Sequence, residues 1–228
     1  MGIVRMGVPE DIVLYLKEIC DIETFVETGT FHGWTSYWAS SHFKMVYTIE
    51  FSKPIFEQTI KRHAGLINVE FIFGDSRKEL PKIFEKCQNE AIFWLDAHWC
   101  SFGSYGEEDQ CPLIEELKII LASNVNHCIL IDDARLFLSP PALPNSTNFY
   151  PTITDITMMM NKSNYHTIIY EDVIVCIPEA YKSDFVKYMQ MKITVDDKLY
   201  SQKLIKMEKS KQFRRLIKRI IGYKYFVR

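Results

Sequence analysis

The sequence lacks any apolar run of about 18 residues, the length that a membrane-spanning helix requires, so we expect no transmembrane segment. Its start has no basic stretch followed by an apolar one, so we expect no secretory signal and a cytoplasmic location. The six cysteines form no Cys-x-x-Cys pair, which indicates reduced thiols and argues against a zinc site. The net charge is only −2, which disfavours nucleic acid as a partner of the whole chain.

Two phosphate-binding signatures are missing or incomplete. No Gly-Lys-Ser/Thr run exists, so the chain has no phosphate loop. The dinucleotide-binding run Gly-x-Gly-x-x-Gly is incomplete, because Thr30 and Phe31 fill much of the turn after Gly29. The turn begins instead with Glu27, whose carboxylate would repel a pyrophosphate. A carboxylate there suits a ligand with an ammonium group and a sulfonium, such as S-adenosylmethionine; a purely structural turn is the alternative.

What the sequence does contain is a regular alternation of strand and helix patterns. Hydrophobic residues make up 47% of the chain, which is enough for a sizeable core. Apolar runs that predict strands lie at residues 25–27, 45–49, 68–73, 91–95, 127–131, 165–170 and 173–177. Segments with helical spacing of apolar residues separate the first five runs. The pattern predicts an α/β, Rossmann-like fold, with a mostly parallel seven-stranded sheet, helices on both faces and an antiparallel C-terminal hairpin.

This reading divides the chain into three parts. Residues 1–21 form an N-terminal helical segment, residues 22–178 form the α/β domain, and residues 179–228 form a helical, basic tail. The loops at residues 100–110 and 136–150 follow predicted strands, so we expect them to border a ligand pocket. The four tryptophans are expected mainly in the core, with Trp99 as the candidate for stacking on a ligand.

Acids follow five consecutive predicted strands, at the sheet edge where such folds bind their ligands. They are Glu27, Glu50, Asp75, Asp96 and Asp132 with Asp133. Like charges gathered at one edge repel one another, so we expect a cationic or donor-rich ligand to balance them. An adenosine with an ammonium-bearing tail would use three or four acids, and a divalent metal would use the rest. Each acid could instead cap a helix or orient a loop.

On these residues, the stretch from 24 to 178 resembles the class I S-adenosylmethionine-dependent methyltransferases. The resemblance implies cofactor binding by Glu27, Thr28, Gly29, Thr30, Gly33, Glu50, Phe51, Asp75, Ser76 and Asp96. Within this set, Glu50 would accept hydrogen bonds from the ribose, and Asp75 would accept one from the adenine amine.

Residues 93–98, 111–117 and 129–135 further resemble a bacterial subgroup that accompanies genes for surface polysaccharides, such as capsule, and natural-product sugars. This resemblance implies O-methylation of a sugar or glycan-related small molecule, with a magnesium ion held by Asp96, Asp132 and Asp133. The chain departs from such enzymes at position 98, where they often have a second aspartate. His98 is therefore a metal ligand, a general base or neither; we expect His98 and Asp96 to act in catalysis, with His98 taking the acceptor's proton.

Two other functions remain open at this point. One is an oxidoreductase that binds a nucleotide sugar or NAD, against which Phe31 and the incomplete glycine run argue. The other is a nucleotide-binding module without catalytic activity, against which the acids at every strand end argue.

The C-terminal tail concentrates positive charge. Residues 203–228 carry ten basic side chains and one acidic one, a net charge of +9, so the remaining chain is at −11. Apolar residues recur there at helical spacing, namely Phe213, Leu216, Ile217, Ile220 and Ile221. A basic amphipathic helix predicts peripheral contact with the inner face of a membrane. The alternatives are docking on the chain's own acidic body or in a homodimer, and nucleic-acid binding is disfavoured.

Overall fold

The structure is a computed structural model that describes residues 7–99, 106 and 108–225, with side chains described as far as residue 212. The chain divides into two compact units, Met1–Lys182 and Ser183–Arg228.

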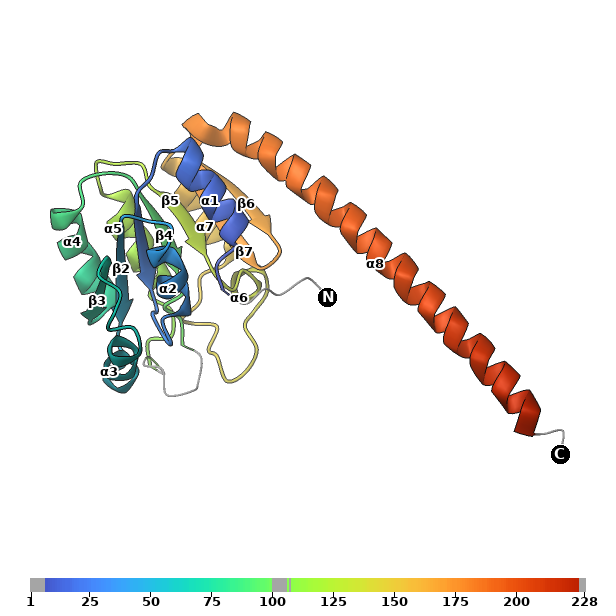
Figure 1. The fold of residues 1–228 in the computed structure, drawn as a ribbon. Coiled ribbons are helices and arrows are strands. Elements are labelled where there is room, and N and C mark those ends of the chain that lie inside the picture. The colour runs from blue at the N-terminus through green and yellow to red at the C-terminus, as the bar shows by residue number, and fades with distance from the viewer. Residues whose placement is uncertain (1–6, 100–105, 107, 226–228) are drawn as a thin grey trace. The chain divides into compact units, whose positions relative to one another are not determined.

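The first unit is built around one seven-stranded sheet (Figure 1). Its strands are β1 (Thr24–Thr28), β2 (Met45–Glu50), β3 (Val69–Phe73), β4 (Ala91–Leu95), β5 (Cys128–Ile131), β6 (Tyr165–Tyr170) and β7 (Val173–Pro178). They are ordered β3-β2-β1-β4-β5-β7-β6, and β1 to β5 pair in parallel. Strand β7 pairs antiparallel with both β5 and β6, so the C-terminal hairpin closes one edge of the sheet. The fold class and the hairpin predicted from the sequence are confirmed.

Helices connect the strands and cover the sheet. They are α1 (Glu10–Ile19), α2 (Trp34–Ser40), α3 (Lys53–Arg62), α4 (Ser76–Lys86), α5 (Leu113–Leu121), α6 (Arg135–Leu138) and α7 (Ile153–Lys162), followed by a 3₁₀ turn at Glu179–Tyr181. Helix α4 begins two residues earlier than its apolar spacing predicts, because Asp75 accepts a hydrogen bond from the Arg77 backbone N–H and so caps it. Thr152 and Asp155 form a reciprocal capping box at the start of α7.

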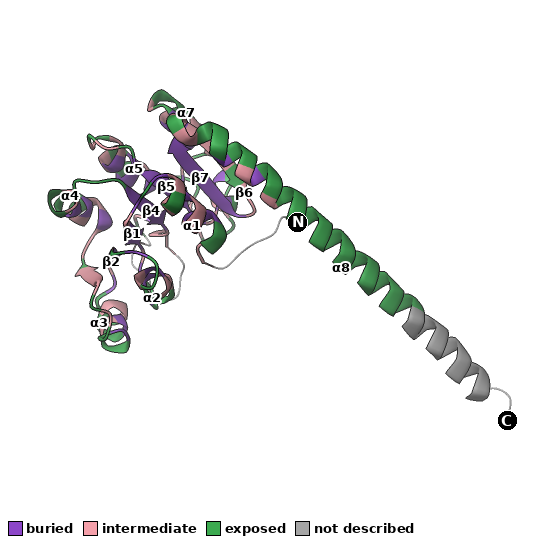
Figure 2. Ribbon diagram, turned by 45° about the horizontal axis from the view of Figure 1, so that its top comes forward, coloured by how far each residue is buried: buried purple, intermediate pink, exposed green. Residues whose placement is uncertain are grey.

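The core forms because alternate residues of each strand face opposite layers of helices. On one face, Phe25 packs against Trp38 and Phe43 beside α2. On the other face, Val26 shares a hydrophobic cluster with Leu80 of α4 and with residues of α5 and α7. Figure 2 shows the strands as the most buried part of this unit, as expected for a parallel sheet covered on both sides.

The four tryptophans do not share one environment. Trp94 in β4 is fully buried, as expected, but Trp34 at the start of α2 is 63% exposed. The expectation of a core position is therefore wrong for Trp34. Helix α2 is only seven residues long, and its buried residues are Ser36 and Ala39 rather than Trp34 at its start.

The second unit is one long helix. Helix α8 (Lys182–Tyr225) begins directly after the 3₁₀ turn. Most of its side chains up to residue 212 are exposed, as Figure 2 shows. The apolar stripe predicted at Phe213 to Ile221 lies outside the described side chains. Among the described residues, no helix combines the length and the apolar character that a membrane span requires.

Candidate functional site

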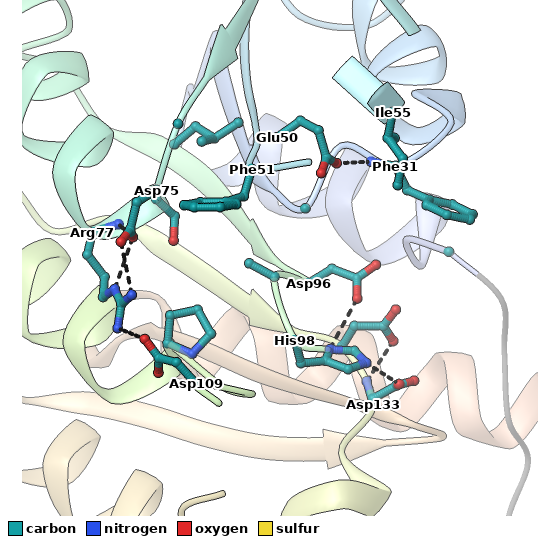
Figure 3. A pocket seen from close by; sticks show the side chains of 18 of the residues that line it. Phe31, Glu50, Phe51, Ile55, Asp75, Arg77, Asp96, His98, Asp109 and Asp133 are labelled. Atoms are coloured by element: carbon teal, nitrogen blue, oxygen red, sulfur yellow. Dashed lines mark hydrogen bonds and ion pairs between the residues drawn. The ribbon is translucent and has the colours of Figure 1, made fainter. Parts of the chain in front are cut away.

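A cavity of about 480 Å³ opens at the carboxyl ends of the parallel strands. Residues that directly follow β1 to β5 line it, and they include Gly29, Glu50, Phe51, Asp75, Ser76, Asp96, His98, Asp132 and Asp133. The volume is typical of small-molecule sites. Figure 3 shows these side chains converging from separate strand ends, so the structure brings together most of the acids that the sequence placed at one edge.

The turn after β1 passes very close to the end of β4. Gly29 has φ +86°, and a Cβ atom there would lie 2.2 Å from the backbone O of Asp96. Its N–H donates to the backbone O of Ile49, which ties the turn to β2 at 3.0 Å. Only glycine fits this approach, which leaves the space beside the turn open as part of the cavity.

Glu27 occupies a different place from the one expected. We expected its carboxylate to face a ligand, but it is 2% exposed and is not among the residues that line the cavity. It accepts hydrogen bonds from Ser36 Oγ of α2 and, at 2.7 Å, from Thr48 Oγ1 of β2. Burial raises the pKa of Glu27 to about 7, although these hydrogen bonds oppose the shift.

Other residues of the first turn also support it from behind. The Oγ1 atoms of Thr30 and Thr48 lie 2.6 Å apart, and Gly33 takes a left-handed conformation just before α2. Thr28, Thr30 and Gly33 do not line the cavity. The contact of Thr30 and the backbone conformation of Gly33 therefore shape the turn, and Thr28 is buried at the end of β1.

Glu50 lies in the cavity wall and is held by backbone groups. Its Oε2 atom accepts from the Phe31 N–H at 2.8 Å, and its Oε1 atom accepts from the Ser52 N–H at 2.7 Å. Burial raises the pKa of Glu50, and hydrogen bonds from the backbone N–H groups of Ser52, Phe31 and Phe51 oppose that shift. A carboxylate has about four lone-pair sites, so Glu50 can accept one further hydrogen bond from a ligand.

Asp75 is paired with an arginine that the sequence reading did not single out. Arg77 forms a two-pronged ion pair with Asp75, with both N···O distances at 2.9 Å, and its Nη1 atom lies 2.6 Å from Asp109 Oδ2. Burial tends to raise the pKa of Asp75, but the hydrogen bonds and charge of Arg77 lower it below its usual value. Figure 3 shows Arg77 between the two acids at one end of the cavity.

His98 lies between two carboxylates at the other end of the cavity. Its Nε2 atom is 2.8 Å from Asp133 Oδ2, and its Nδ1 atom is 3.4 Å from Asp96 Oδ1. The shorter contact assigns the ring proton to Nε2, donated to Asp133. The Nδ1 lone pair is then left beside Asp96, and this is the nitrogen that can accept a proton.

Asp133 is held by a second cation besides His98. Arg135 Nη1 lies 2.6 Å from Asp133 Oδ1 and also pairs with Asp172, which is 3% exposed in the turn between β6 and β7. Burial would raise the pKa of Asp133, but His98 and Arg135 lower it. The neighbouring Asp132 shows the opposite shift, because burial and the charge of Asp133 raise its pKa.

The residues around Asp133 do not fit a magnesium site. Both of its carboxylate oxygens already contact protein cations or donors, His98 on one side and Arg135 on the other. Magnesium needs near-octahedral oxygen ligands, so it would have to displace one of these side chains from Asp133. Across the part of the chain that the structure describes, no three His, Cys, Asp or Glu residues are grouped to hold a metal ion.

Three residues of this site escaped the sequence reading: Arg77, Asp109 and Asp172. Arg77 directly follows a predicted ligand segment, so its charge was a usable signal. Asp109 lay within the loop at 100–110, whose residues 100–105 and 107 fall outside the described part. The predicted stacking residue Trp99 is half-buried and does not line the cavity.

Comparison with known proteins finds structures with a similar fold, but no protein with a similar sequence. No family model matches the sequence, and no curated protein matches it. Among solved structures, the chain is similar to the O-methyltransferase TomG from Streptomyces achromogenes, involved in tomaymycin synthesis and solved with S-adenosylmethionine. The two are 17% identical, with a TM-score of 0.52 over 77% of this chain and 82% of TomG.

Two further structures are similar to a comparable degree. An O-methyltransferase candidate from Klebsiella pneumoniae is 14% identical, with a TM-score of 0.51 over 76% of this chain and 82% of that one. A methyltransferase candidate from Streptococcus mutans, solved with S-adenosylhomocysteine, is 10% identical, with a TM-score of 0.52 over 76% of this chain and 99% of that one. The chain therefore has the Rossmann-like fold of these methyltransferases.

Proposed function

We propose that this chain is an S-adenosylmethionine-dependent O-methyltransferase. The observation that carries the proposal is the division of the cavity into two chemically different ends. At one end lie Gly29, Glu50 and Phe51, which suit a nucleoside. At the other end His98 lies between two carboxylates, which suits removal of a proton from a hydroxyl. The fold shared with O-methyltransferases supports the same reaction.

The cofactor end is prepared for binding before any ligand enters. Glu50 is oriented by backbone N–H groups and keeps a lone pair for a ribose hydroxyl. Gly29 leaves room for close approach of a ligand to the backbone. S-adenosylmethionine, when bound, supplies a methyl group on a positively charged sulfur. The acids that line the cavity favour that positive charge.

The catalytic end acts by holding and moving one proton. Asp133 accepts the Nε2 proton of His98 and thereby fixes the ring orientation. His98 Nδ1 would take the proton of an acceptor hydroxyl, while S-adenosylmethionine held beside Glu50 would supply the methyl group to that oxygen, and its sulfur would keep the electron pair of the broken bond. Asp96, 3.4 Å from Nδ1, stabilises the imidazolium that results. No step requires a metal, and magnesium assistance stays a prediction of the resemblance.

The finer proposal is that the acceptor is a sugar or a glycan-related small molecule, as the resemblance of residues 93–98, 111–117 and 129–135 implies. No observation of the cavity favours the oxidoreductase alternative.

For the tail, we propose that residues 203–228 contact an anionic membrane surface. Flotation of the full-length protein with anionic vesicles at low salt, and its release at high salt, tests that proposal.

The reaction class is tested by calorimetry on the full-length protein with S-adenosylhomocysteine and with NAD. We expect S-adenosylhomocysteine to bind and NAD not to bind. Glu50→Ala should weaken S-adenosylhomocysteine binding by about 1–3 kcal/mol, the range for a hydrogen bond to a charged group. Glu57→Ala, an exposed residue on α3, is the matched control. Binding of NAD alone, or unchanged affinity in Glu50→Ala, would contradict the proposal.

A second measurement addresses the chemical step. Radiolabelled S-adenosylmethionine is incubated with the protein and a mixture of neutral saccharides, and label transfer is followed. His98→Ala should abolish transfer but leave S-adenosylhomocysteine affinity unchanged, because His98 contacts the acceptor end of the cavity. Transfer at the wild-type rate by the His98→Ala variant would show that His98 does not take the proton of the acceptor.

A further inference from the structure

Helix α2 and the turn before it expose three large aromatic side chains beside the cavity. Trp34 is 63% exposed, Tyr37 is 52% exposed, and Phe31 is 42% exposed. Trp34 and Tyr37 are three positions apart on a helix, so they lie on the same face. We call these three residues the aromatic platform. Large exposed aromatic groups in a cluster mark interaction sites more often than isolated ones do.

The platform is held in place rather than left free in solvent. His63, which is 6% exposed, lies with its ring centroid 5.7 Å from Trp34 and 5.8 Å from Tyr37. The guanidinium of Arg62 lies 5.8 Å from the Trp34 ring. Because Arg62 and His63 hold the rings of Trp34 and Tyr37 in place, these side chains would lose little conformational freedom when a ligand binds to them.

The turn that carries Phe31 is fixed by the same helix. Thr59 Oγ1 donates to the backbone O of Phe31 at 2.6 Å, and His63 Nε2 lies 2.9 Å from the backbone O of His32. A Cβ atom on Gly33 would lie within 3.0 Å of both Thr59 and His63. The three side chains are therefore presented by a tightly packed junction of the turn, α2 and α3.

The platform is continuous with the cavity through Phe31. Phe31 lines the cavity, and its N–H donates to Glu50, the proposed ribose acceptor. Figure 3 shows Phe31 at the margin of the cavity beneath Ile55. Phe31 is therefore the member of the platform that borders the cavity, and Trp34 follows it three residues later at the start of α2.

The size of the platform fits a small ligand better than a second protein subunit. Half-exposed aromatic side chains of this kind offer together roughly 300 Å², taking half of the 150–250 Å² that each can bury. A stable protein interface needs about 800 Å² on each partner. The platform alone is therefore too small for a dimer, but it can cover a few stacked rings.

The charge around the cavity disfavours an anionic ligand. Residues 1–182 carry a net charge of −11, and Glu50, Asp96 and Asp133 lie in the cavity itself. A polyanion such as RNA, or an anionic membrane, would be repelled from this surface. Flat rings with an apolar C–H face and hydroxyl groups at their edges, as in neutral sugars, pair with aromatic faces without bringing charge. Arg62 and the Tyr37 hydroxyl can donate to those hydroxyl groups.

We propose that the aromatic platform binds a neutral saccharide chain by stacking, with one end of that chain reaching the cavity past Phe31. Its role as part of the methyl acceptor rests on the proposed methyltransferase function, but saccharide binding does not. The platform thereby narrows the acceptor class to neutral oligosaccharides rather than single small molecules.

The test is calorimetry of the full-length protein with three neutral hexasaccharides: maltohexaose, xylohexaose and chitohexaose. We expect at least one to bind, with Trp34→Ala weakening it roughly tenfold and Tyr37→Ala about threefold, as expected for lost ring contacts. Trp34→Phe, which keeps a stacking ring, should retain most of the affinity. Tyr200→Ala removes a 59% exposed tyrosine from α8 and should change nothing.

The outcomes separate this proposal from the methyltransferase assignment. Failure of all three saccharides to bind, or equal binding by Trp34→Ala, overturns the platform even if S-adenosylhomocysteine binds normally. Trp34-dependent binding of a uridine hexanucleotide or of anionic vesicles, without saccharide binding, overturns it as well. If saccharide binding depends on Trp34 but S-adenosylhomocysteine does not bind, the platform stands and the methyltransferase proposal fails.

Discussion

The two ends of the cavity hold their carboxylates in different ways. At the cofactor end, both oxygens of Glu50 accept from backbone N–H groups of residues close to the strand ends. At the catalytic end, Asp133 is held by the side chains of His98 and Arg135, and Arg135 is held in turn by Asp172. One end is thus set by backbone geometry and the other by a chain of side chains from three separate loops.

The difference has a physical consequence for what each end can tolerate. Backbone donors persist under every substitution except proline, so the Glu50 carboxylate stays oriented unless the turn changes shape or Glu50 itself is replaced. A network of charged side chains fails when any one member is lost, because the remaining buried charges are then left without partners. We therefore expect substitutions around Glu50 to affect ligand binding through the backbone of the turn. Substitutions in the network around Asp133 are expected to affect members of the network that they do not contact directly.

The largest effect is expected from Gly29→Ala, which alters the backbone at the cofactor end. A Cβ atom would lie 2.2 Å from the backbone O of Asp96, and φ is +86°, so both the turn and the end of β4 would have to move. We expect a loss of about 3 kcal/mol or more in the free energy of unfolding, together with loss of S-adenosylhomocysteine binding.

Urea denaturation and calorimetry measure these two losses. Gly65→Ala is the control, because no heavy atom lies within 4 Å of its Cβ position and its φ is outside the left-handed region. If Gly29→Ala unfolds at the same urea concentration as Gly65→Ala, the close approach of the turn to β4 does not require glycine at position 29.

The next effect concerns Glu27, a carboxylate behind the cofactor end that is held by side-chain hydroxyls. Its pKa is raised from 4.5 to about 7, so the folded protein keeps this proton over a range in which the unfolded chain has lost it. The stabilisation from this group is complete below about pH 4.5 and disappears as the pH rises to about 7. Glu27→Gln removes the titration, so the variant should gain about 3 kcal/mol relative to the wild type across that range, at about 1.4 kcal/mol per pKa unit.

Urea unfolding at pH 4.5, 6 and 8 measures the difference between the two proteins. Glu116, whose pKa burial also raises to about 7, contributes equally to both and cancels. His127, whose pKa burial lowers to about 4, has the opposite pH dependence and cancels too. A constant difference at all three pH values would show that the pKa of Glu27 is not raised in the folded protein.

The same contrast explains how far the sequence could predict the site. Glu50 was found because it ends an apolar strand, and its partners Phe31 and Ser52 follow from local turns. The orientation of Glu27 was also available in principle: it alternates with Val26 along β1 and shares a face with Phe25, which packs against Trp38 of α2. A carboxylate on that face must point toward α2 rather than into a cavity.

Asp172 could not be predicted in this way. It lies 37 positions after Arg135, and it reaches Arg135 because β7 pairs with β5 and so places the hairpin turn beside the end of β5. The sequence predicted a hairpin but not which strand of it would pair with β5. The exposure of Trp34 was equally hidden, because an apolar residue at the first position of a short helix gives no periodic signal.

A moderate effect is expected from Asp172→Asn at the catalytic end. The asparagine keeps an acceptor for the Arg135 N–H but removes the charge that holds the guanidinium. Asp133 would then be held less firmly, and His98 with it. We expect kcat for methyl transfer to fall roughly tenfold, equivalent to about 1.4 kcal/mol, with KM for S-adenosylmethionine unchanged.

Steady-state kinetics is combined with the stoichiometry of S-adenosylhomocysteine binding by calorimetry, because a loss of active fraction would also lower the apparent kcat without changing KM. Full binding stoichiometry together with the lower kcat would separate the role of Asp172 from a general loss of structure. Asp184→Asn, an exposed ion-paired acid on α8, is the control. An increase in KM for S-adenosylmethionine with unchanged kcat would show that Asp172 acts on the cofactor end. The proposed difference between the two ends of the cavity would then be wrong.

The smallest effect is expected from removing divalent metal. Both oxygens of Asp133 already have protein partners, since Arg135 contacts one and His98 contacts the other. An added magnesium ion would have to compete with both contacts, whose geometry is that of charge-assisted hydrogen bonds. We therefore expect methyl transfer to proceed at an unchanged rate in excess chelator, and Asp132→Asn to leave chelator sensitivity unaltered. Loss of turnover in chelator that magnesium restores would instead show that His98 or Arg135 moves aside, and that the acids after β4 and β5 form the metal site that the sequence resemblance implied.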